Sequence, residues 1–369
     1  MPHQRPRVIG PILIKKLKLW PILGLIGPRQ CGKSTLIRDL LTNKLSIEYF
    51  TMDSKNQRER AFASPEAFCE PADKTLKVID EIQKVPDLFD SIKFHVDKKK
   101  RPGMYLISGS KQFSQLIGIR ESLTGRIGML NLYPFNLTEI HQKNFGEYFI
   151  GKKSTKSLIT LKEFEKKIMK GGMPGFFYLH SEEEFSSSMQ MWLETTCFRD
   201  LANVMKFNFN GELALEILTT LCQCERPTAT EVASLLKKDT RIIKRYLNAF
   251  EEILILKTVH PHEVSTGKEH YVLIDAGIVS YLGGSRDSAL RAHVMTEALS
   301  IFETYGMAAP LIKYYQSEKK SYIPLVFEWK RTQKMLIVQI SDSENQTLLE
   351  LGSINSFKNR LNNKRENIR

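Results

Sequence analysis

Residues 27–34 have the spacing of a phosphate-binding loop. They read GPRQCGKS and fit the pattern G-x-x-x-x-G-K-[ST] through Gly27, Gly32, Lys33 and Ser34. The glycines allow the backbone to curl, so that successive N–H groups point at one anion. Lys33 is then placed to reach the β- and γ-phosphates of a nucleotide, and the Ser34 hydroxyl to hold Mg²⁺.

The residues on either side of this loop have the periodicities of a strand and a helix. The apolar run ILGLI at 22–26 precedes the loop and is typical of a buried parallel strand. The segment STLIRDLL at 34–41 follows it and places its apolar residues at helical spacing. Because a helix N-terminus attracts anions, this order of elements favours a phosphate site over an ordinary glycine turn.

Two adjacent carboxylates follow another short apolar stretch, in TLKVIDEIQKVPD at 75–87. Downstream of a phosphate loop, Asp80 at the end of a strand would hold Mg²⁺, and Glu81 would orient and polarise the attacking water. A solvated helix start is the alternative reading of such a pair. The position after an apolar strand favours the catalytic reading.

Further apolar runs predict three more strands, within 46–53, 104–110 and 127–135. Five strands with interleaved helices predict an α/β fold, a doubly wound parallel sheet. Ser108 and Ser110 end the fourth strand. Ligands of open α/β sheets bind outside the carboxyl ends of strands, so Ser110 is a candidate for polar contact with the γ-phosphate.

Five segments carry a family resemblance, and they occur in the order GPRQCGKSTL, VIDEIQKVPD, LISGS, ESLTGRIGMLNLYPFNLTEI and GGMPGF. Together they resemble the bacterial and archaeal AAA-type ATPases that have a winged helix and a C-terminal domain of unknown function. The resemblance is strong over roughly residues 15–285. It implies an ATPase that binds ATP and Mg²⁺ and hydrolyses the nucleotide. The nucleotide-contacting residues we expect are Gly27, Pro28, Arg29, Gln30, Cys31, Gly32, Lys33, Ser34, Thr35 and Ser110, with Ser34 and Asp80 as metal ligands and Lys33 and Glu81 as catalytic groups.

Arg126 lies before the fifth predicted strand, in a region that supplies an arginine finger to a neighbouring subunit in related AAA-type ATPases. The resemblance thus makes Arg126 a candidate catalytic residue across the interface of a homo-oligomer. A surface arginine, or one that holds the turn, is the alternative.

The predicted helices and strands of the rest of the chain, together with the resemblance, suggest three further units. We expect an ATPase core over 1–150, a helical lid over 151–210, a winged helix over 211–285 and a C-terminal domain over 286–369. Arg199 and Asp200 in the lid could approach the phosphates, although pairing at the surface is the simpler interpretation.

The third predicted helix of the winged-helix region, TRIIKRYLNAFEEIL at 240–254, has one apolar and one basic face. The basic face contains Arg241, Lys244, Arg245 and Asn248, which we expect to contact double-stranded DNA in the major groove. The alternative is that a core-facing helix simply has a polar back, and that the winged helix binds protein or packs between domains. An ATPase coupled to DNA and a slow nucleotide-gated switch with a protein partner both remain open.

The C-terminal domain resembles a degenerate restriction-endonuclease-type fold. Its helix glutamate is present as Glu297, but Pro324 stands at the aspartate position, and Gln339 and Ser341 stand at the glutamate and lysine positions. Because these changes remove metal ligands, nuclease activity is not expected. Glu328 and Asp342 are candidate substitutes. Packing, oligomerisation or binding of a protein partner is the expected role.

Composition sets the remaining limits. The chain has 369 residues, 42% of them hydrophobic, and a net charge of +13, which suits an anionic partner such as nucleic acid. Its 5 cysteines are odd in number and lack framework spacing, which indicates a reducing compartment and no zinc site. No apolar run is long enough to span a membrane, so we expect a cytoplasmic protein without membrane insertion.

Overall fold

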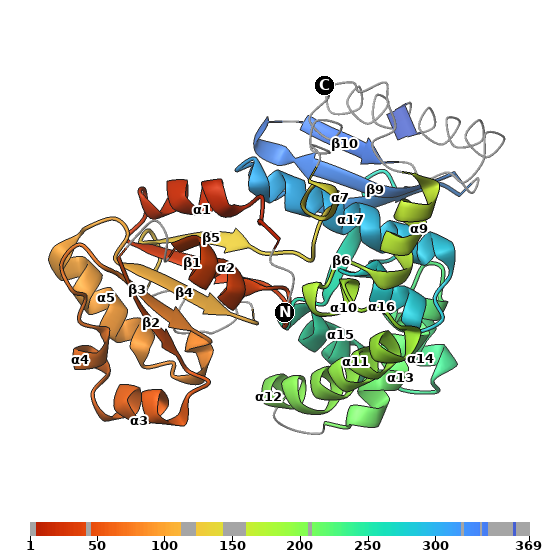
Figure 1. The fold of residues 1–369 in the computed structure, drawn as a ribbon. Helices are drawn as coiled ribbons and strands as arrows, with labels where there is room; N and C mark the ends of the chain where they lie inside the picture. The colour runs from red at the N-terminus through yellow and green to blue at the C-terminus, as the bar shows by residue number, and fades with distance from the viewer. Residues whose placement is uncertain are drawn as a thin grey trace.

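The computed structural model describes most of the chain and shows a parallel α/β unit beside a larger helical and sheet-containing region (Figure 1). The described residues are 5–41, 46–111, 123–142, 160–205, 209–318, 321–332, 334–338 and 357–358. Residues 112–122 and the candidate residues Gln339, Ser341 and Asp342 lie outside them.

The first sheet has five parallel strands in the order β2-β3-β4-β1-β5. The strands are β1 (Ile22–Ile26), β2 (Ile47–Thr51), β3 (Leu76–Asp80), β4 (Tyr105–Gly109) and β5 (Ile127–Asn131). All five residues of β1, β3 and β4 are buried, which explains their continuous apolar runs. The predicted α/β class and the five-stranded parallel sheet are confirmed.

Alternate residues of β1 pack into different cores, because successive side chains of a strand point to opposite faces. Leu23 and Leu25 belong to one cluster, with α1 (Gly10–Leu17) and α2 (Lys33–Leu41). Ile22 and Ile26 belong to the other, which includes buried side chains of α3 (Lys55–Ala63), α4 (Pro65–Cys69) and α5 (Leu88–Lys99). Helices therefore cover both faces of the sheet.

Short helices lead away from β5 into the second region. They are α7 (Leu137–His141), α9 (Leu161–Lys170), α10 (Pro174–Phe177) and α11 (Glu182–Glu194). A six-residue π-helical segment, η3 (Thr195–Asp200), continues α11 and leads to α12 (Ala202–Met205). Asn136, Thr160 and Ser181 each begin a helix with a capping box, which satisfies backbone N–H groups that would otherwise lack partners.

Three helices and a hairpin come next: α13 (Gly211–Gln223), α14 (Ala229–Leu235), α15 (Thr240–Glu252), β6 (Leu256–Pro261) and β7 (His270–Leu273). Strands β6 and β7 are antiparallel, with Leu256 opposite Leu273. Three helices followed by a β-hairpin thus lie within 211–285, where the sequence predicts a winged helix.

The hairpin joins a second five-stranded sheet in the order β10-β9-β8-β6-β7. Strand β6 pairs with β8 (Leu311–Gln316) through His260 and Lys313, and β9 (Tyr322–Trp329) and β10 (Lys334–Val338) complete the sheet. Helices α16 (Ala276–Tyr281) and α17 (Arg286–Thr304) pack against it and against α9.

None of the described helices is long and apolar enough to cross a membrane.

Candidate functional site

The loop between β1 and α2 has the tight curvature that its sequence predicts. Gln30 and Gly32 have φ angles of 63° and 94°. A Cβ atom on Gly27 would lie 2.3 Å from the carbonyl oxygen of Leu132, so only glycine fits there. The Lys33 ammonium donates hydrogen bonds to the carbonyl oxygens of Gly27 (2.8 Å) and Pro28 (3.0 Å). The structure therefore holds the lysine charge over the loop that would receive the phosphates.

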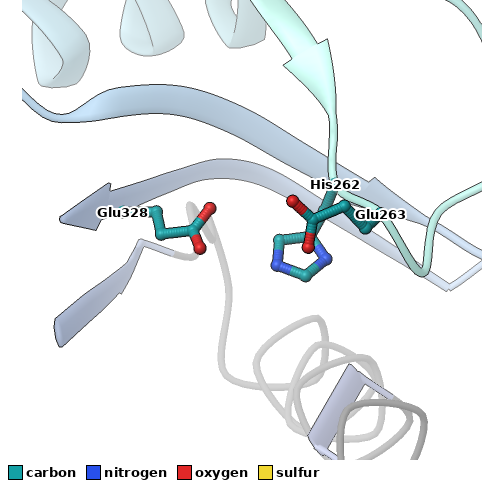
Figure 2. Close-up of side chains that lie close together, drawn as sticks. All are labelled: His262, Glu263 and Glu328. Carbon is teal, nitrogen blue, oxygen red and sulfur yellow. The ribbon is translucent and has the colours of Figure 1, made fainter. Parts of the chain in front are cut away.

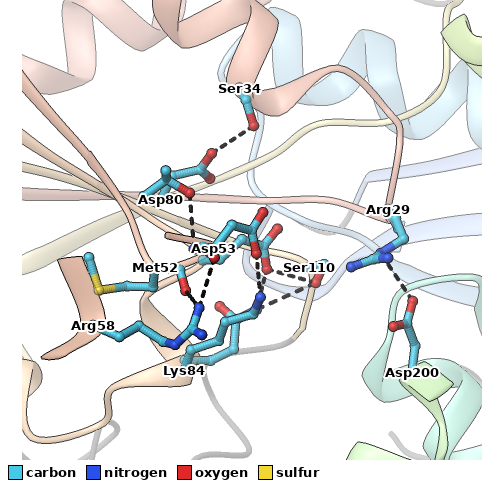
Figure 3. Close-up of polar contacts among 12 residues, drawn as sticks. Arg29, Ser34, Met52, Asp53, Arg58, Asp80, Lys84, Ser110 and Asp200 are labelled. Carbon is cyan, nitrogen blue, oxygen red and sulfur yellow. Dashed lines mark hydrogen bonds and ion pairs between the residues drawn. The ribbon is translucent and has the colours of Figure 1, made fainter. Parts of the chain in front are cut away.

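Asp80 ends β3 next to this loop and accepts three side-chain hydrogen bonds. The Ser34 hydroxyl donates to its Oδ2 at 2.7 Å, the Tyr49 hydroxyl to the same oxygen at 2.6 Å, and Ser108 to Oδ1 (Figure 3 shows the Ser34 contact). Burial raises the pKa of Asp80, but the three donors and the Lys33 charge outweigh it and hold the pKa below its ordinary value. Asp80 is therefore an anion, and with Ser34 it offers the hard oxygen ligands that Mg²⁺ prefers.

Glu81 follows in a left-handed backbone conformation, with φ 54° and ψ 41°. Strand β3 therefore ends at Asp80. The Ser110 hydroxyl donates to Glu81 Oε2 at 3.1 Å, and the Gln83 amide donates to the same oxygen. The structure thus brings together Glu81 and Ser110, which the sequence placed at the carboxyl ends of the third and fourth predicted strands.

A cavity of about 730 Å³ lies beside these residues. Its lining includes Arg29 from the loop, Glu81, Ser110 and, from η3, Arg199 and Asp200. Arg29 Nε lies 3.1 Å from Asp200 Oδ2, as Figure 3 shows. Asp200 also accepts from Arg199 at 3.3 Å. The predicted surface pairing of Arg199 with Asp200 is present, but Asp200 reaches the phosphate loop as well.

The remaining loop residues divide between the core and the surface. Pro28 and Cys31 are buried, whereas Gln30 and Thr35 are exposed. Burial raises the pKa of the Cys31 thiol, although Lys33 and Arg7 lower it. A buried thiol with a raised pKa is a poor nucleophile, which agrees with an inert loop cysteine.

Arg126 lies at the opposite end of the sheet from the phosphate loop. Its carbonyl oxygen accepts from the backbone N–H of Ile22, at the start of β1, whereas the loop follows the end of that strand. Its guanidinium donates to both carboxylate oxygens of Asp97 on α5, at 2.6 and 3.0 Å. Within one chain Arg126 therefore holds a surface pair, and its role across a subunit interface stays a prediction.

The predicted DNA-contacting residues of α15 share the exposed side of that helix. Arg241, Lys244, Arg245 and Asn248 are all exposed, while the facing residues Ile243, Tyr246, Leu247 and Phe250 are buried. Arg241 pairs with Asp239, and Lys244 lies 3.3 Å from Glu269 in the hairpin loop. Ile242, an apolar residue of the same helix, is nevertheless 39% exposed.

Glu297 of α17 is buried and accepts backbone hydrogen bonds from another part of the chain. Its two carboxylate oxygens accept from the backbone N–H of Leu137 at 3.1 and 3.0 Å, at the start of α7. Burial raises the pKa of Glu297, while the nearby Lys167 lowers it. Glu297 therefore ties the C-terminal region to the segment that leaves the parallel sheet.

A second set of possible metal ligands lies in the C-terminal sheet. His262, Glu263 and Glu328 have ligand atoms within 4.8 Å of one another (Figure 2). Lys313 Nζ lies 3.0 Å from Glu263 and also pairs with Glu328. Because this ammonium already pairs with both carboxylates, a divalent cation would have to displace it. The expectation that the domain has no nuclease activity stays a prediction.

Several residues that contact the site were not identified from the sequence. They are Arg7, which reaches the loop from the N-terminal segment, Tyr49 on β2, Gln83 after β3 and Asp200 on η3. For Asp200 alone, the sequence had suggested an approach to the phosphates, beside the simpler interpretation of surface pairing with Arg199. None of these four residues ends a strand, so the signal that identified Asp80 and Ser110, a polar residue at the carboxyl end of a strand, does not find them.

Several known proteins are similar to this chain. A protein-family model described as an AAA domain matches residues 20–141. Uncharacterized proteins of Mycobacterium bovis and Mycobacterium tuberculosis are each similar to this chain, with 25% identity over 85% of this chain and 70% of theirs. Among solved structures, a Walker-type ATPase of Pyrococcus abyssi has a TM-score of 0.45 at 15% identity, over 76% of this chain and 99% of that one. AMPPCP-bound DnaA from Aquifex aeolicus has a TM-score of 0.31 at 12% identity, over 66% and 86%. The match to the AAA domain covers the phosphate loop and all five strands of the parallel sheet, so residues 20–141 are similar to a P-loop domain of the AAA type.

Proposed function

We propose that the protein binds ATP at the 27–35 loop and hydrolyses it in the presence of Mg²⁺. The observation that carries this proposal is the contact of Ser34 with Asp80, 2.7 Å apart, beside the Lys33 ammonium. A lysine, a hydroxyl and an ionised carboxylate at one loop are the groups that a magnesium nucleotide requires.

Each of these residues has a separate role. The loop amides and Lys33 bind the β- and γ-phosphates, and Ser34 and Asp80 would hold Mg²⁺, which neutralises phosphate charge when it is bound. Glu81 orients the attacking water and accepts its proton. Ser110 positions Glu81 through the 3.1 Å hydrogen bond and supplies a hydroxyl near the terminal phosphate.

The test is to measure nucleotide binding and turnover separately, by calorimetry and by phosphate release. Lys33→Ala should abolish ATP binding, and Glu81→Gln should retain binding while its turnover falls by about 100-fold or more. ATP hydrolysis by Glu81→Gln at the parental rate would exclude Glu81 as the base. Absence of any heat from the folded wild-type protein with ATP and Mg²⁺ would refute the proposal as a whole.

We propose further that ATP turnover is coupled to DNA through α15, in a winged helix formed by residues 211–285. The support is the exposed row of Arg241, Lys244, Arg245 and Asn248 on a helix whose other face is buried. The two ion pairs on this row lie at the surface, where pairs are weak enough for DNA phosphates to replace them.

Neutralising Arg241, Lys244 and Arg245 together tests the DNA proposal. The triple variant should lose affinity for duplex DNA. The slope of its binding constant against salt concentration should also become less steep, by the amount that about three phosphate contacts contribute. Its ATP turnover should lose any stimulation by DNA. Unchanged duplex affinity with an unchanged salt slope would rule out this helix as the reader.

The alternative is a slow nucleotide-gated switch that binds a protein partner. One observation favours it: Leu235 at the end of α14 is 60% exposed and Ile242 at the start of α15 is 39% exposed. Exposed apolar side chains beside the basic row could pack against a protein partner. Tight nucleotide retention with little turnover, and no effect of DNA, would favour this alternative.

A further inference from the structure

We propose that Arg29 is a catalytic cation that acts on the γ-phosphate within its own chain, and that Asp200 holds it in a resting position. The inference rests on the proposed ATP hydrolysis and names a residue for it. Asp200 belongs to η3, so the pair links the phosphate loop to the helical segment 195–200.

The position of Arg29 carries the first part of the inference. Among the described residues that line the 730 Å³ cavity, Arg29 alone belongs to the loop 27–34. Glu81 and Ser110 line the same cavity, so the guanidinium shares a space with the proposed base. A nucleotide whose phosphates lie on the loop amides would present its terminal phosphate toward these groups.

The contact between Arg29 and Asp200 supports the proposal that Asp200 holds Arg29 in a resting position. The Arg29 and Asp200 side chains are 33% and 17% exposed, and their contact is 3.1 Å. A terminal phosphate has more negative charge than a carboxylate and accepts two parallel bonds from a guanidinium. Asp200 keeps Arg199 as a partner at 3.3 Å when Arg29 leaves, so the exchange does not strand a half-buried charge.

Three other cations, Arg126, Lys84 and Lys111, are less suitable. Arg126 lies at the far end of β1, and a strand rises about 3.3 Å per residue, which puts roughly 13 Å between the two ends. Lys84 pairs with Asp53, and Lys111 donates to the carbonyl oxygen of Asn203. Neither lysine is part of the phosphate loop.

The chemistry that Arg29 would assist is hydrolysis of the terminal phosphoanhydride. The water oxygen forms a bond to the γ-phosphorus as the bond to the β–γ bridging oxygen breaks, and that oxygen keeps the electron pair. Glu81 takes the water proton. Negative charge develops on the departing ADP and on the γ-phosphate oxygens, where a guanidinium stabilises the transition state more than the bound substrate.

The experiment compares four variants of the full chain: Arg29→Ala, Arg29→Lys, Asp200→Asn, and Lys84→Ala as the control for another cavity cation. Turnover is measured at saturating ATP with Mg²⁺. Nucleotide affinity is measured by calorimetry with each change made in a Glu81→Gln background. A urea midpoint for each variant shows that it is folded.

Arg29→Ala should reduce kcat by about 100-fold or more while the Kd for ATP changes less than threefold. Arg29→Lys should recover only part of kcat, because lysine lacks the bidentate fork. Asp200→Asn should raise kcat about two- to tenfold, and this gain should vanish in the Arg29→Ala/Asp200→Asn double variant. Lys84→Ala should stay within threefold of the parent.

If the wild-type protein hydrolyses ATP and the kcat of Arg29→Ala lies within threefold of the wild-type kcat, the inference about Arg29 is wrong and the proposed function stands. An equal loss of affinity and turnover in Arg29→Ala would also overturn it, since Arg29 would then be only a binding group. A fall in kcat for Asp200→Asn would overturn the resting position. A wild-type protein that neither binds nor hydrolyses ATP would instead refute the proposed function.

Discussion

Arg7 donates a hydrogen bond from Nη1 to the carbonyl oxygen of Cys31, 2.7 Å away, and so holds the phosphate loop from outside the matched AAA domain. The same guanidinium donates to Glu139 Oε1 at 2.8 Å and to the carbonyl oxygen of Tyr133 at 2.6 Å. The Arg7 and Glu139 side chains are only 6% and 1% exposed. A buried ion pair therefore connects the loop to the segment that leaves the parallel sheet.

We predict that Arg7→Met destabilises the protein by about 3–5 kcal/mol, because it leaves the Glu139 carboxylate buried without its charge partner. Urea unfolding measures this loss. The Arg7→Met/Glu139→Gln double variant should recover part of it, since the uncompensated charge is then gone. A loss below about 1 kcal/mol for the single variant would contradict a buried pair of this kind.

We predict that Gly171→Ala destabilises the protein far more than Gly125→Ala. Both glycines have positive φ angles, of 71° and 77°. A Cβ atom on Gly171 would lie 1.9 Å from Asp275 Oδ1, which also accepts from Gly277, whereas nothing lies within 4 Å of a Cβ atom on Gly125. Gly125→Ala should therefore cost about 1 kcal/mol of backbone strain and Gly171→Ala several times that, as urea unfolding would show. Equal losses would mean that Asp275 moves aside freely.

We predict that His270 makes the protein less stable as the pH falls from about 6.5 to about 4. Burial lowers the pKa of His270 to about 4, with help from Arg291 and Arg226, and its ring stacks on Tyr314 at 4.1 Å. Because the folded pKa lies below the unfolded one, the neutral ring stabilises the fold fully above pH 6.5. That stabilisation disappears as the pH falls toward the folded value.

His270→Phe keeps an aromatic ring on Tyr314 and removes the titration. The difference in unfolding free energy between wild type and His270→Phe should change by up to about 3 kcal/mol between pH 7 and pH 4. Urea unfolding at several pH values measures it. His293, whose pKa burial lowers to about 3, is unchanged in both proteins and cancels in the difference. A difference that does not depend on pH would show that His270 titrates normally in the fold.

We predict that Arg126→Ala lowers turnover only at protein concentrations where copies of the chain associate. Arg126 is bound to Asp97 and lies far from its own phosphate loop, so it can reach only the nucleotide of another copy. Asp97→Ala is the matched control, because it breaks the same pair and leaves the arginine free. Turnover and size in solution are measured over the same concentration range. A kcat of Arg126→Ala that equals the parental value throughout would end the finger hypothesis.

The sequence by itself determined the phosphate loop, the strand before it and the helix after it. The roles that we propose for Gly27, Lys33 and Ser34 depend on spacing along a few residues, and Asp80 ends a run of apolar residues that forms the buried strand β3. Short-range periodicity also identified α15 and its exposed basic side. These features could be predicted because the interactions that define them lie within one or two adjacent elements.

Only the tertiary structure decided which distant residues meet these groups. Tyr49 reaches Asp80 because β2 pairs with β3, and Asp200 reaches Arg29 across more than a hundred residues of chain. Glu297 meets Leu137 for the same reason, and Ile242 is exposed although its helical position looks apolar. Periodicity tells which side of an element is buried, but not which element covers it, because that choice depends on how all the buried surfaces fit together.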